Sequence, residues 1–279
     1  MEIGLQVYSV RQNMEKDFWA ALEKVAEIGY RNIEFANHIA DQDPGIGHHI
    51  DAYKLKDKMD QLGLKTIGNH VHPFDKADMD KVIEYNKIIG NDSIGCGIGF
   101  FSGTDSAIAF AKWLNKIGGI CADSGMTFYY HNHYQEFQRF DGKTVMDILL
   151  ENTDEDFVKF ELDTFWTLRG GVDPVEYLKI LGDRCILIHQ KDLSKDTSPV
   201  NIFDKIGKDA DLSEMKNFGV FSQTDFTEIG EGAMDIKKII DTAQELGHAK
   251  CIILEQDYSS RNELESIEIS YNNLAGMIG

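Results

Sequence analysis

The stretch FYYHNHYQEF, residues 128–137, places three aromatic residues directly before histidine, asparagine and glutamate. Its first half has the aromatic, β-favouring composition of a buried strand, and its second half is polar. Two later stretches, CILIHQKD (185–192) and KCIILEQD (250–257), change from apolar to polar in the same direction. Buried strands that all finish in polar residues indicate a parallel sheet with a functional site at the carboxyl ends of its strands.

Strand-like and helical segments alternate along the whole chain. Strands are expected at residues 2–8, 31–36, 65–74, 92–100, 126–133, 156–163, 185–192 and 250–257. The first helix is indicated by apolar residues at helical spacing from Phe18 to Ala26, with Gly29 as its stop signal. Further helices are expected at 50–62, 76–89, 105–123, 143–152, 172–181, 234–246 and 261–276.

This alternation predicts one α/β domain over residues 1–279, a closed (β/α)8 TIM barrel. An open, doubly wound sheet is the alternative. Such sheets usually carry a glycine-rich phosphate loop after the first strand, and QVYSVRQNM (6–14) contains no glycine. The irregular segment 193–233 is too long for a plain connection, so it is a candidate active-site lid.

Composition and charge restrict the class of protein. Apolar residues make up 42% of the 279 residues and charged residues 27%, as in ordinary globular proteins. The net charge of -19, without a Lys/Arg cluster, argues against nucleic acid or anionic membranes as partners. The four cysteines are widely spaced, the first residues resemble a strand rather than a leader, and no apolar run reaches ~18 residues. These features predict a cytoplasmic protein with reduced cysteines.

Polar residues gather at the expected carboxyl ends of six strands. They are Glu34 on the second strand; His70 and His72 on the third; His131, His133 and Glu136 at or after the fifth; Asp163 on the sixth; His189 and Lys191 on the seventh; and Glu255 on the eighth. Five of the nine histidines of the chain belong to this set. Histidines and carboxylates that converge from different strands suit a divalent metal, with Asp163, His189 and Glu255 as core ligands.

The sixth strand leaves one point open. Side chains two apart in a strand share a face, so an inward Asp163 also turns Glu161 and Lys159 inward unless the strand bends at its end. Lys191 also has two readings. It either reaches the substrate or forms an ion pair with Asp192 or Glu255.

Seven segments, in this order, resemble the sugar phosphate isomerase/epimerase family, the xylose-isomerase-like TIM barrels: GLQVYSVR, NIEF, YHNHYQEF, ELDTFW, IHQKD, IGEGAMD and LEQD. The resemblance covers essentially the whole chain. It implies one divalent metal held by a strand-five carboxylate together with Asp163, His189 and Glu255. This sequence departs from the family at strand five, where His131 replaces a glutamate, and at Trp166, where the epimerases often have histidine.

The resemblance also implies a chemistry, namely removal of a proton next to a carbonyl. Glu255 corresponds to one catalytic base, and His131, His133 or Glu136 would serve the opposite face of the substrate. Glu136 matches a glutamate that contacts substrate hydroxyls in the epimerases. The first prediction is therefore a metal-dependent isomerase or epimerase of a sugar or keto-polyol that works through an enediolate. The alternatives are a lyase or dehydratase, similar to inosose dehydratase or a 3-keto-glycoside lyase, and an inactive sugar-binding or subunit relative.

The expected partners follow from the same resemblance. The substrate is a small sugar or keto-polyol, the metal is Mn²⁺ first and otherwise Co²⁺, Zn²⁺ or Mg²⁺, and a homo-oligomer is expected by analogy. The residues expected to contact the substrate are Glu34, His70, His72, His133, Trp166 and Lys191.

Overall fold

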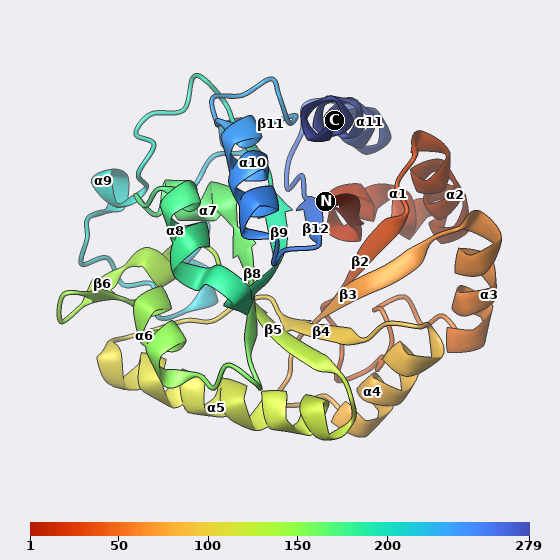
Figure 1. Cartoon of the computed structure of the whole chain (residues 1–279), viewed down its shortest axis with the longest axis horizontal. Helices are drawn as coiled ribbons and strands as arrows, with labels where there is room; N and C mark the ends of the chain where they lie inside the picture. Colours follow the sequence, from red (N-terminus) through yellow and green to blue (C-terminus); the bar gives the residue numbers. More distant parts are fainter.

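In the computed structural model, which describes residues 1–279, eight parallel strands close into a barrel (Figure 1). The strands are β1 (Glu2–Gln6), β2 (Asn32–Asn37), β3 (Lys65–Val71), β4 (Ser93–Cys96), β5 (Thr127–His131), β8 (Lys159–Asp163), β9 (Cys185–Gln190) and β12 (Cys251–Leu254). They follow one another around the barrel in sequence order, and β12 closes it against β1. The predicted (β/α)8 barrel is confirmed.

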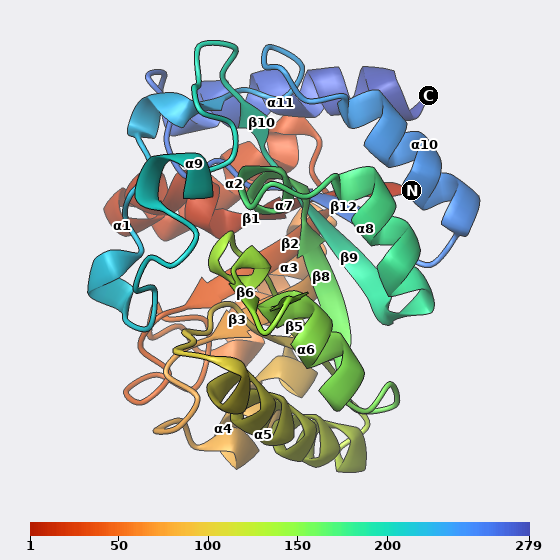
Figure 2. The same cartoon turned by 90° about the vertical axis from the view of Figure 1, so that its left-hand side faces the viewer.

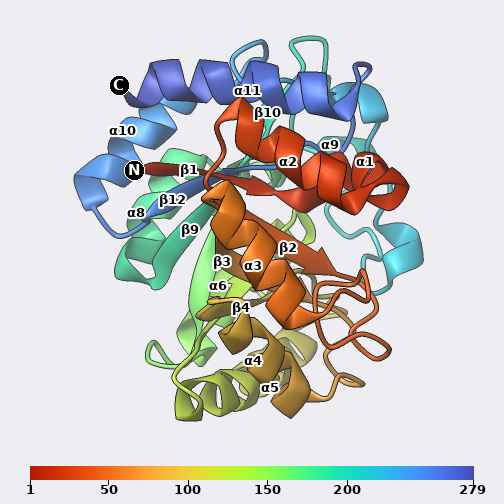
Figure 3. The ribbon, with the colours of Figure 1, turned by 90° about the vertical axis from the view of Figure 1, so that its right-hand side faces the viewer.

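The helices cover the outside of the barrel. They are α1 (Arg11–Lys16), α2 (Phe18–Ile28), α3 (Ala52–Leu62), α4 (Met79–Ile88), α5 (Thr104–Asp123), α6 (Val145–Asn152), α7 (Thr164–Arg169), α8 (Pro174–Leu181), α10 (Ile236–Leu246) and α11 (Glu263–Ile278). Figure 3 shows α11, α2, α3 and α4 in succession around one side. None of the helices is both long enough and apolar enough to cross a membrane.

Two apolar layers support the strands. The larger core lies between the strands and the surrounding helices. A small cluster inside the barrel contains Tyr129, Leu187, Cys251 and Ile253, all of them buried. Because side chains alternate along a strand, His189 shares the inner face of β9 with Leu187. The inside of the barrel is therefore apolar below and polar towards the carboxyl ends of its strands.

The short helix α7, absent from the sequence prediction, begins directly after β8. Asp163 ends the strand and caps the helix, because its Oδ1 accepts a hydrogen bond from the Trp166 backbone N–H at 2.8 Å. This cap fixes one carboxylate oxygen of Asp163. The other oxygen, Oδ2, remains turned towards the inside of the barrel, where Lys191 reaches it.

Segment 193–233 contains local structure of its own (Figure 2). It includes α9 (Phe203–Ile206), and β10 (Asp192–Leu193) pairs with β11 (Phe226–Thr227) across it. The buried Arg169 side chain holds the segment through the carbonyls of Pro199 and Val200 and the carboxylate of Asp225. Aromatic residues of the segment pack against Trp166, so it is anchored to the barrel at the end where the polar strand ends lie.

Candidate active site

A cavity of about 410 Å³ opens at the carboxyl ends of the strands. Histidines and carboxylates line its floor and walls: His38, His70, His72, His131, His133, Glu255 and Asp257. Aromatic and apolar residues line the rest, including Tyr8, Trp166, Met215, Phe218, Phe221 and Tyr258. Met215, Phe218 and Phe221 come from segment 193–233, so the predicted lid segment forms part of the cavity wall.

The structure brings together the four residues expected to hold a metal. His131, Asp163, His189 and Glu255 each offer one ligand atom, and all four atoms lie within 4.8 Å of one another. His189 Nδ1 is 3.0 Å from Glu255 Oε2, and His131 Nε2 is 3.9 Å from Asp163 Oδ2. Glu255 is the member nearest to solvent, with 12% of its side chain exposed. In this group, here called the upper cluster, His131 and Glu255 line the cavity, and Asp163 and His189 are fully buried beside them.

Lys191 lies inside the upper cluster. Its Nζ is 2.5 Å from Glu255 Oε2, donates a second hydrogen bond to Asp163 Oδ2, and is 4.0 Å from Asp257 Oδ2. Burial alone would lower the pKa of Lys191, but the charges of Asp163, Asp257 and Glu255 raise it above its ordinary value. Of the two predicted ion pairs the structure forms the one with Glu255.

Asp192 has a different role. Its carboxylate accepts hydrogen bonds from the backbone N–H groups of Gly230, Gly232 and Met234, and so fixes the end of segment 193–233. The predicted ion pair between Lys191 and Asp192 is therefore wrong. Side chains of adjacent residues on an extended chain point in opposite directions, which separates the two groups.

The upper cluster fits a divalent metal. Two carboxylates already converge on one cationic nitrogen, and two imidazoles complete a mixed nitrogen and oxygen set. Such a set suits Mn²⁺, Co²⁺ or Zn²⁺. Burial and the neighbouring charge of His189 lower the pKa of His131, so this imidazole is neutral and keeps a lone pair for a ligand bond.

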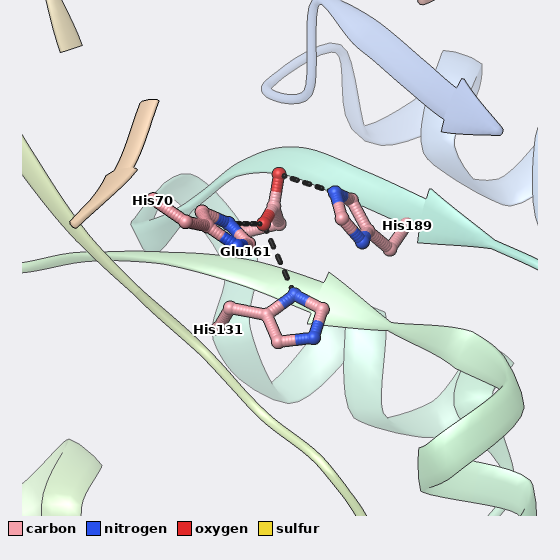
Figure 4. Close-up of side chains that lie close together, drawn as sticks. All are labelled: His70, His131, Glu161 and His189. Carbon is pink, nitrogen blue, oxygen red and sulfur yellow. Dashed lines mark hydrogen bonds and ion pairs between the residues drawn. The ribbon is translucent and has the colours of Figure 1, made fainter. Parts of the chain in front are cut away.

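A second group of charged residues lies directly below. Glu161 is fully buried, and its Oε2 accepts hydrogen bonds from His131 Nδ1 at 3.0 Å and His70 Nε2 at 2.8 Å (Figure 4). Its Oε1 lies 3.2 Å from His189 Nε2. Glu161 was not predicted as a site residue, although strict alternation from Asp163 had indicated its inward direction. The structure shows that the alternation holds and that β8 carries both carboxylates inward.

Glu34 also lies below the cavity and does not line it. It accepts hydrogen bonds from His189 Nε2 at 2.5 Å, Gln6 Nε2 at 2.9 Å and the Tyr129 hydroxyl. Strand β2 continues to Asn37, so Glu34 sits in the middle of the strand and not at its end as the sequence had suggested. Burial would raise the pKa of Glu34, but His70 and His189 lower it below its ordinary value.

The remaining predicted residues divide into two groups. His70, His72, His133 and Trp166 line the cavity. Glu136 does not, because its carboxylate accepts hydrogen bonds from the Tyr130 hydroxyl and the His133 backbone N–H. Burial raises the pKa of Glu136 to about 7.

Two ring systems at the site are held in opposite charge states. Burial and the nearby Lys191 lower the pKa of His133 to about 3, so its imidazole is neutral. Burial would also lower the pKa of His70, but Glu34 and Glu161 raise it to about 10. The cavity therefore presents a neutral imidazole, while a charged one bridges the carboxylates beneath.

Comparison with known proteins gives the chain a context. The sequence profile of the xylose isomerase-like TIM barrel matches residues 22–274. Inosose dehydratase of Clostridium botulinum strain Alaska E43 / Type E3 is 33% identical over 157 residues, 56% of this chain and 49% of that protein. The chain thus spans about half the length of this curated relative. Inosose dehydratase of Geobacillus kaustophilus is 28% identical over 260 residues, 85% of this chain and 79% of that protein.

Solved structures agree on the fold. A sugar phosphate isomerase/epimerase from Parabacteroides distasonis has a TM-score of 0.77 at 22% identity, covering 100% of this chain and 95% of that chain. The IOLI protein, solved with a bound zinc atom, has a TM-score of 0.70 at 15% identity and covers 100% of this chain and 98% of that chain.

Proposed function

Because the chain belongs to the xylose isomerase-like TIM barrel family, we propose that it is a metal-dependent enzyme that removes a proton next to a carbonyl of a sugar or keto-polyol. One observation carries this proposal. The ligand atoms of His131, Asp163, His189 and Glu255 converge at the carboxyl ends of four strands, where His131 and Glu255 line the cavity. These residues would hold the metal, which supplies Lewis-acid polarisation of the carbonyl.

Glu255 is the proposed base. Burial would raise its pKa, but Lys191 and His189 lower it well below the ordinary value, so the carboxylate is ionised. Its side chain is partly exposed to the cavity. Asp257, two residues further on, and His133, after the end of β5, also line the cavity. Burial raises the pKa of Asp257 to about 7, so this carboxyl can return a proton or protonate a leaving hydroxyl, whereas the neutral imidazole of His133 is available only as a proton acceptor.

Two outcomes follow from the same first step. If the proton returns to the other face, the product is an epimer or isomer. If the electron pair left by the proton expels a neighbouring hydroxyl as water, the product is an unsaturated ketone. For the opposite face of the substrate the sequence indicated His131, His133 or Glu136, and of these three Glu136 lies against Tyr130 and away from the cavity.

We place the dehydratase first and the isomerase or epimerase second. The likeness to inosose dehydratases over 85% of the chain supports the same order. For either reaction we propose an uncharged substrate, because no lysine or arginine lines the cavity and the charged His70 is already paired with Glu34 and Glu161. Its aromatic residues suit the apolar faces of a sugar or cyclitol ring.

Incubation with Mn²⁺ in D₂O, followed by NMR, tests the proposal. The substrates are an inosose and a panel of free ketohexoses. We expect deuterium at the carbon next to the carbonyl, or an enone product with its ultraviolet absorbance. Both signals are lost in Glu255→Gln and Asp163→Asn and retained in the exposed control Asp57→Asn. Failure of the wild type to bind any divalent metal would contradict the proposal.

A further inference from the structure

Each of the two proposed histidine ligands faces two layers of the barrel with its two ring nitrogens. His131 turns Nε2 towards Asp163 in the upper cluster and Nδ1 towards Glu161 below it. His189 does the reverse, because its Nδ1 lies 3.0 Å from Glu255 above and its Nε2 lies 2.5 Å from Glu34 below. The two rings thus meet the same upper cluster through opposite nitrogens.

We propose that Glu161 and Glu34 are positioning residues that fix opposite tautomers of these two histidines when the metal is bound. His131 carries its proton on Nδ1 and ligates through Nε2, whereas His189 carries its proton on Nε2 and ligates through Nδ1. This inference rests on the proposed function, because it requires a metal in the upper cluster.

The assignment follows from hydrogen-bond chemistry. An ionised carboxylate can only accept, and a neutral imidazole has one N–H donor and one lone pair. A ring nitrogen that bonds to a carboxylate must therefore carry the proton, and in His131 this leaves the lone pair on Nε2. Both nitrogens of His189 meet carboxylates in the metal-free structure, so a metal would bind there by displacing the proton of Nδ1, next to Glu255. Metal-ligating histidines commonly donate their second nitrogen to a carboxylate, which fixes the ring and raises its basicity.

The two carboxylates are themselves held in place. His70 Nε2 donates to Glu161 Oε2 at 2.8 Å (Figure 4). The same nitrogen lies 3.3 Å from Glu34 Oε1, so the imidazolium of His70 bridges both carboxylates. Neither glutamate has any exposed surface, and the apolar cluster of Tyr129, Leu187, Cys251 and Ile253 occupies the same interior of the barrel. A buried carboxylate is costly unless it is paired, so this layer carries a penalty that a purely structural core would avoid.

One carboxylate oxygen of Glu161, Oε1, accepts no hydrogen bond. This buried atom has no partner, because His189 Nε2, 3.2 Å away, donates its proton to Glu34. An alternative is a second metal held by His70, His131, Glu161 and His189, whose ligand atoms also lie within 4.8 Å of one another. It would use His131 Nδ1 and His189 Nε2, the nitrogens that face Glu161 and Glu34. That arrangement competes with the proposed one, because a neutral imidazole has only one lone pair.

Zinc titration by calorimetry, combined with ¹⁵N-histidine NMR, tests the assignment. For the wild type we expect one Zn²⁺ per chain, with the Nδ1–H tautomer at His131 and the Nε2–H tautomer at His189. Glu161→Gln should weaken zinc binding roughly 10–100-fold. In this variant His131, but not His189, should no longer be held in a single tautomer. In Glu34→Gln, His189 but not His131 should no longer be held in a single tautomer. The tautomers are read in the wild type itself, so the test stands even if a variant does not fold.

Four results would count against the inference. The inference would be overturned if His131 and His189 carried their protons on the same ring nitrogen. It would also be overturned if zinc affinity and both tautomers were unchanged in Glu161→Gln and Glu34→Gln. Either result would leave the proposed function intact. Two zinc ions per wild-type chain, falling to one in Glu161→Gln, would replace it with a second metal site. A wild type that binds no zinc, Mn²⁺ or Co²⁺ would remove the proposed function and the inference together.

Discussion

The ammonium of Lys191 lies 2.5 Å from the Glu255 carboxylate, within the group of side chains that we assign to the metal. A buried lysine thus serves as the cation of the site when no metal is present. A metal in the upper cluster would compete with this ammonium for the oxygens of Asp163 and Glu255. Metal binding therefore requires Lys191 to move, and the nearest other carboxylate is Asp257, whose Oδ2 is 4.0 Å away.

Replacing Lys191 with methionine should destabilise the metal-free protein. The change leaves Asp163 and Glu255 buried without their cation, which we expect to cost about 3 kcal/mol of unfolding free energy. Saturating Mn²⁺ should restore most of this loss, because the ion compensates the same charges. Urea unfolding with EDTA and with Mn²⁺ measures both values. The exposed Lys237→Met serves as control, and an equal loss in both conditions would contradict the competition.

The stability contributed by Glu136 should depend on pH. Burial raises the pKa of this carboxyl from 4.5 to about 7, so the folded protein binds the proton more tightly than the unfolded chain does. Its contribution to stability is therefore fully present below about pH 4.5 and is lost as the pH rises to about 7. Glu136→Gln removes this titration.

We expect the wild type to lose up to about 3 kcal/mol relative to Glu136→Gln between pH 4.5 and pH 8. Urea unfolding at four pH values measures the difference. The exposed Glu268→Gln should show a difference from the wild type that does not change with pH. A constant difference for Glu136→Gln as well would show that its carboxyl titrates normally.

Phe218 should contribute to substrate binding from the lid segment. Its ring stacks on Tyr134 at 5.4 Å, meets the His133 ring edge-on at 5.1 Å, and lines the cavity. Phe218→Ala keeps the backbone carbonyl that accepts the Tyr134 hydroxyl at 2.6 Å. We expect KM to rise about tenfold with a smaller change in kcat, because the ring is remote from the reacting atoms. Steady-state kinetics measure both constants. Val200→Ala, in the same segment outside the cavity, should leave them unchanged.

Two adjacent glycines of α5 should respond oppositely to alanine. A Cβ at Gly118 would lie 2.3 Å from the Phe157 carbonyl oxygen, whereas nothing lies within 4 Å of one at Gly119. Gly118→Ala should therefore destabilise the protein by about 1–3 kcal/mol. Gly119→Ala should stabilise it by about 0.4–1 kcal/mol, because alanine restricts the unfolded chain. Thermal unfolding separates the two, and a similar shift for both would show that α5 adjusts its position.

Much of the site could be predicted because a strand has a period of two residues. His189 and Glu255 follow apolar residues on the same face of their strands, and Asp163 and His131 end theirs. The period also turned Glu161 inward, but it could not tell how deep the residue lies or what it meets. Glu34 shows the same limit, because β2 continues for three residues beyond this glutamate, to Asn37, and so places it beneath the cavity.

The sequence by itself determined the order of strands and helices, the closed parallel barrel and the inward direction of the site residues, because these depend on local periodicity. Only the tertiary structure decided which inward residues share a layer, because the tilt and stagger of barrel strands set the height of each side chain. It brought Lys191 between two carboxylates, turned Glu136 away from the cavity, and placed Glu161 and Glu34 beneath the histidines.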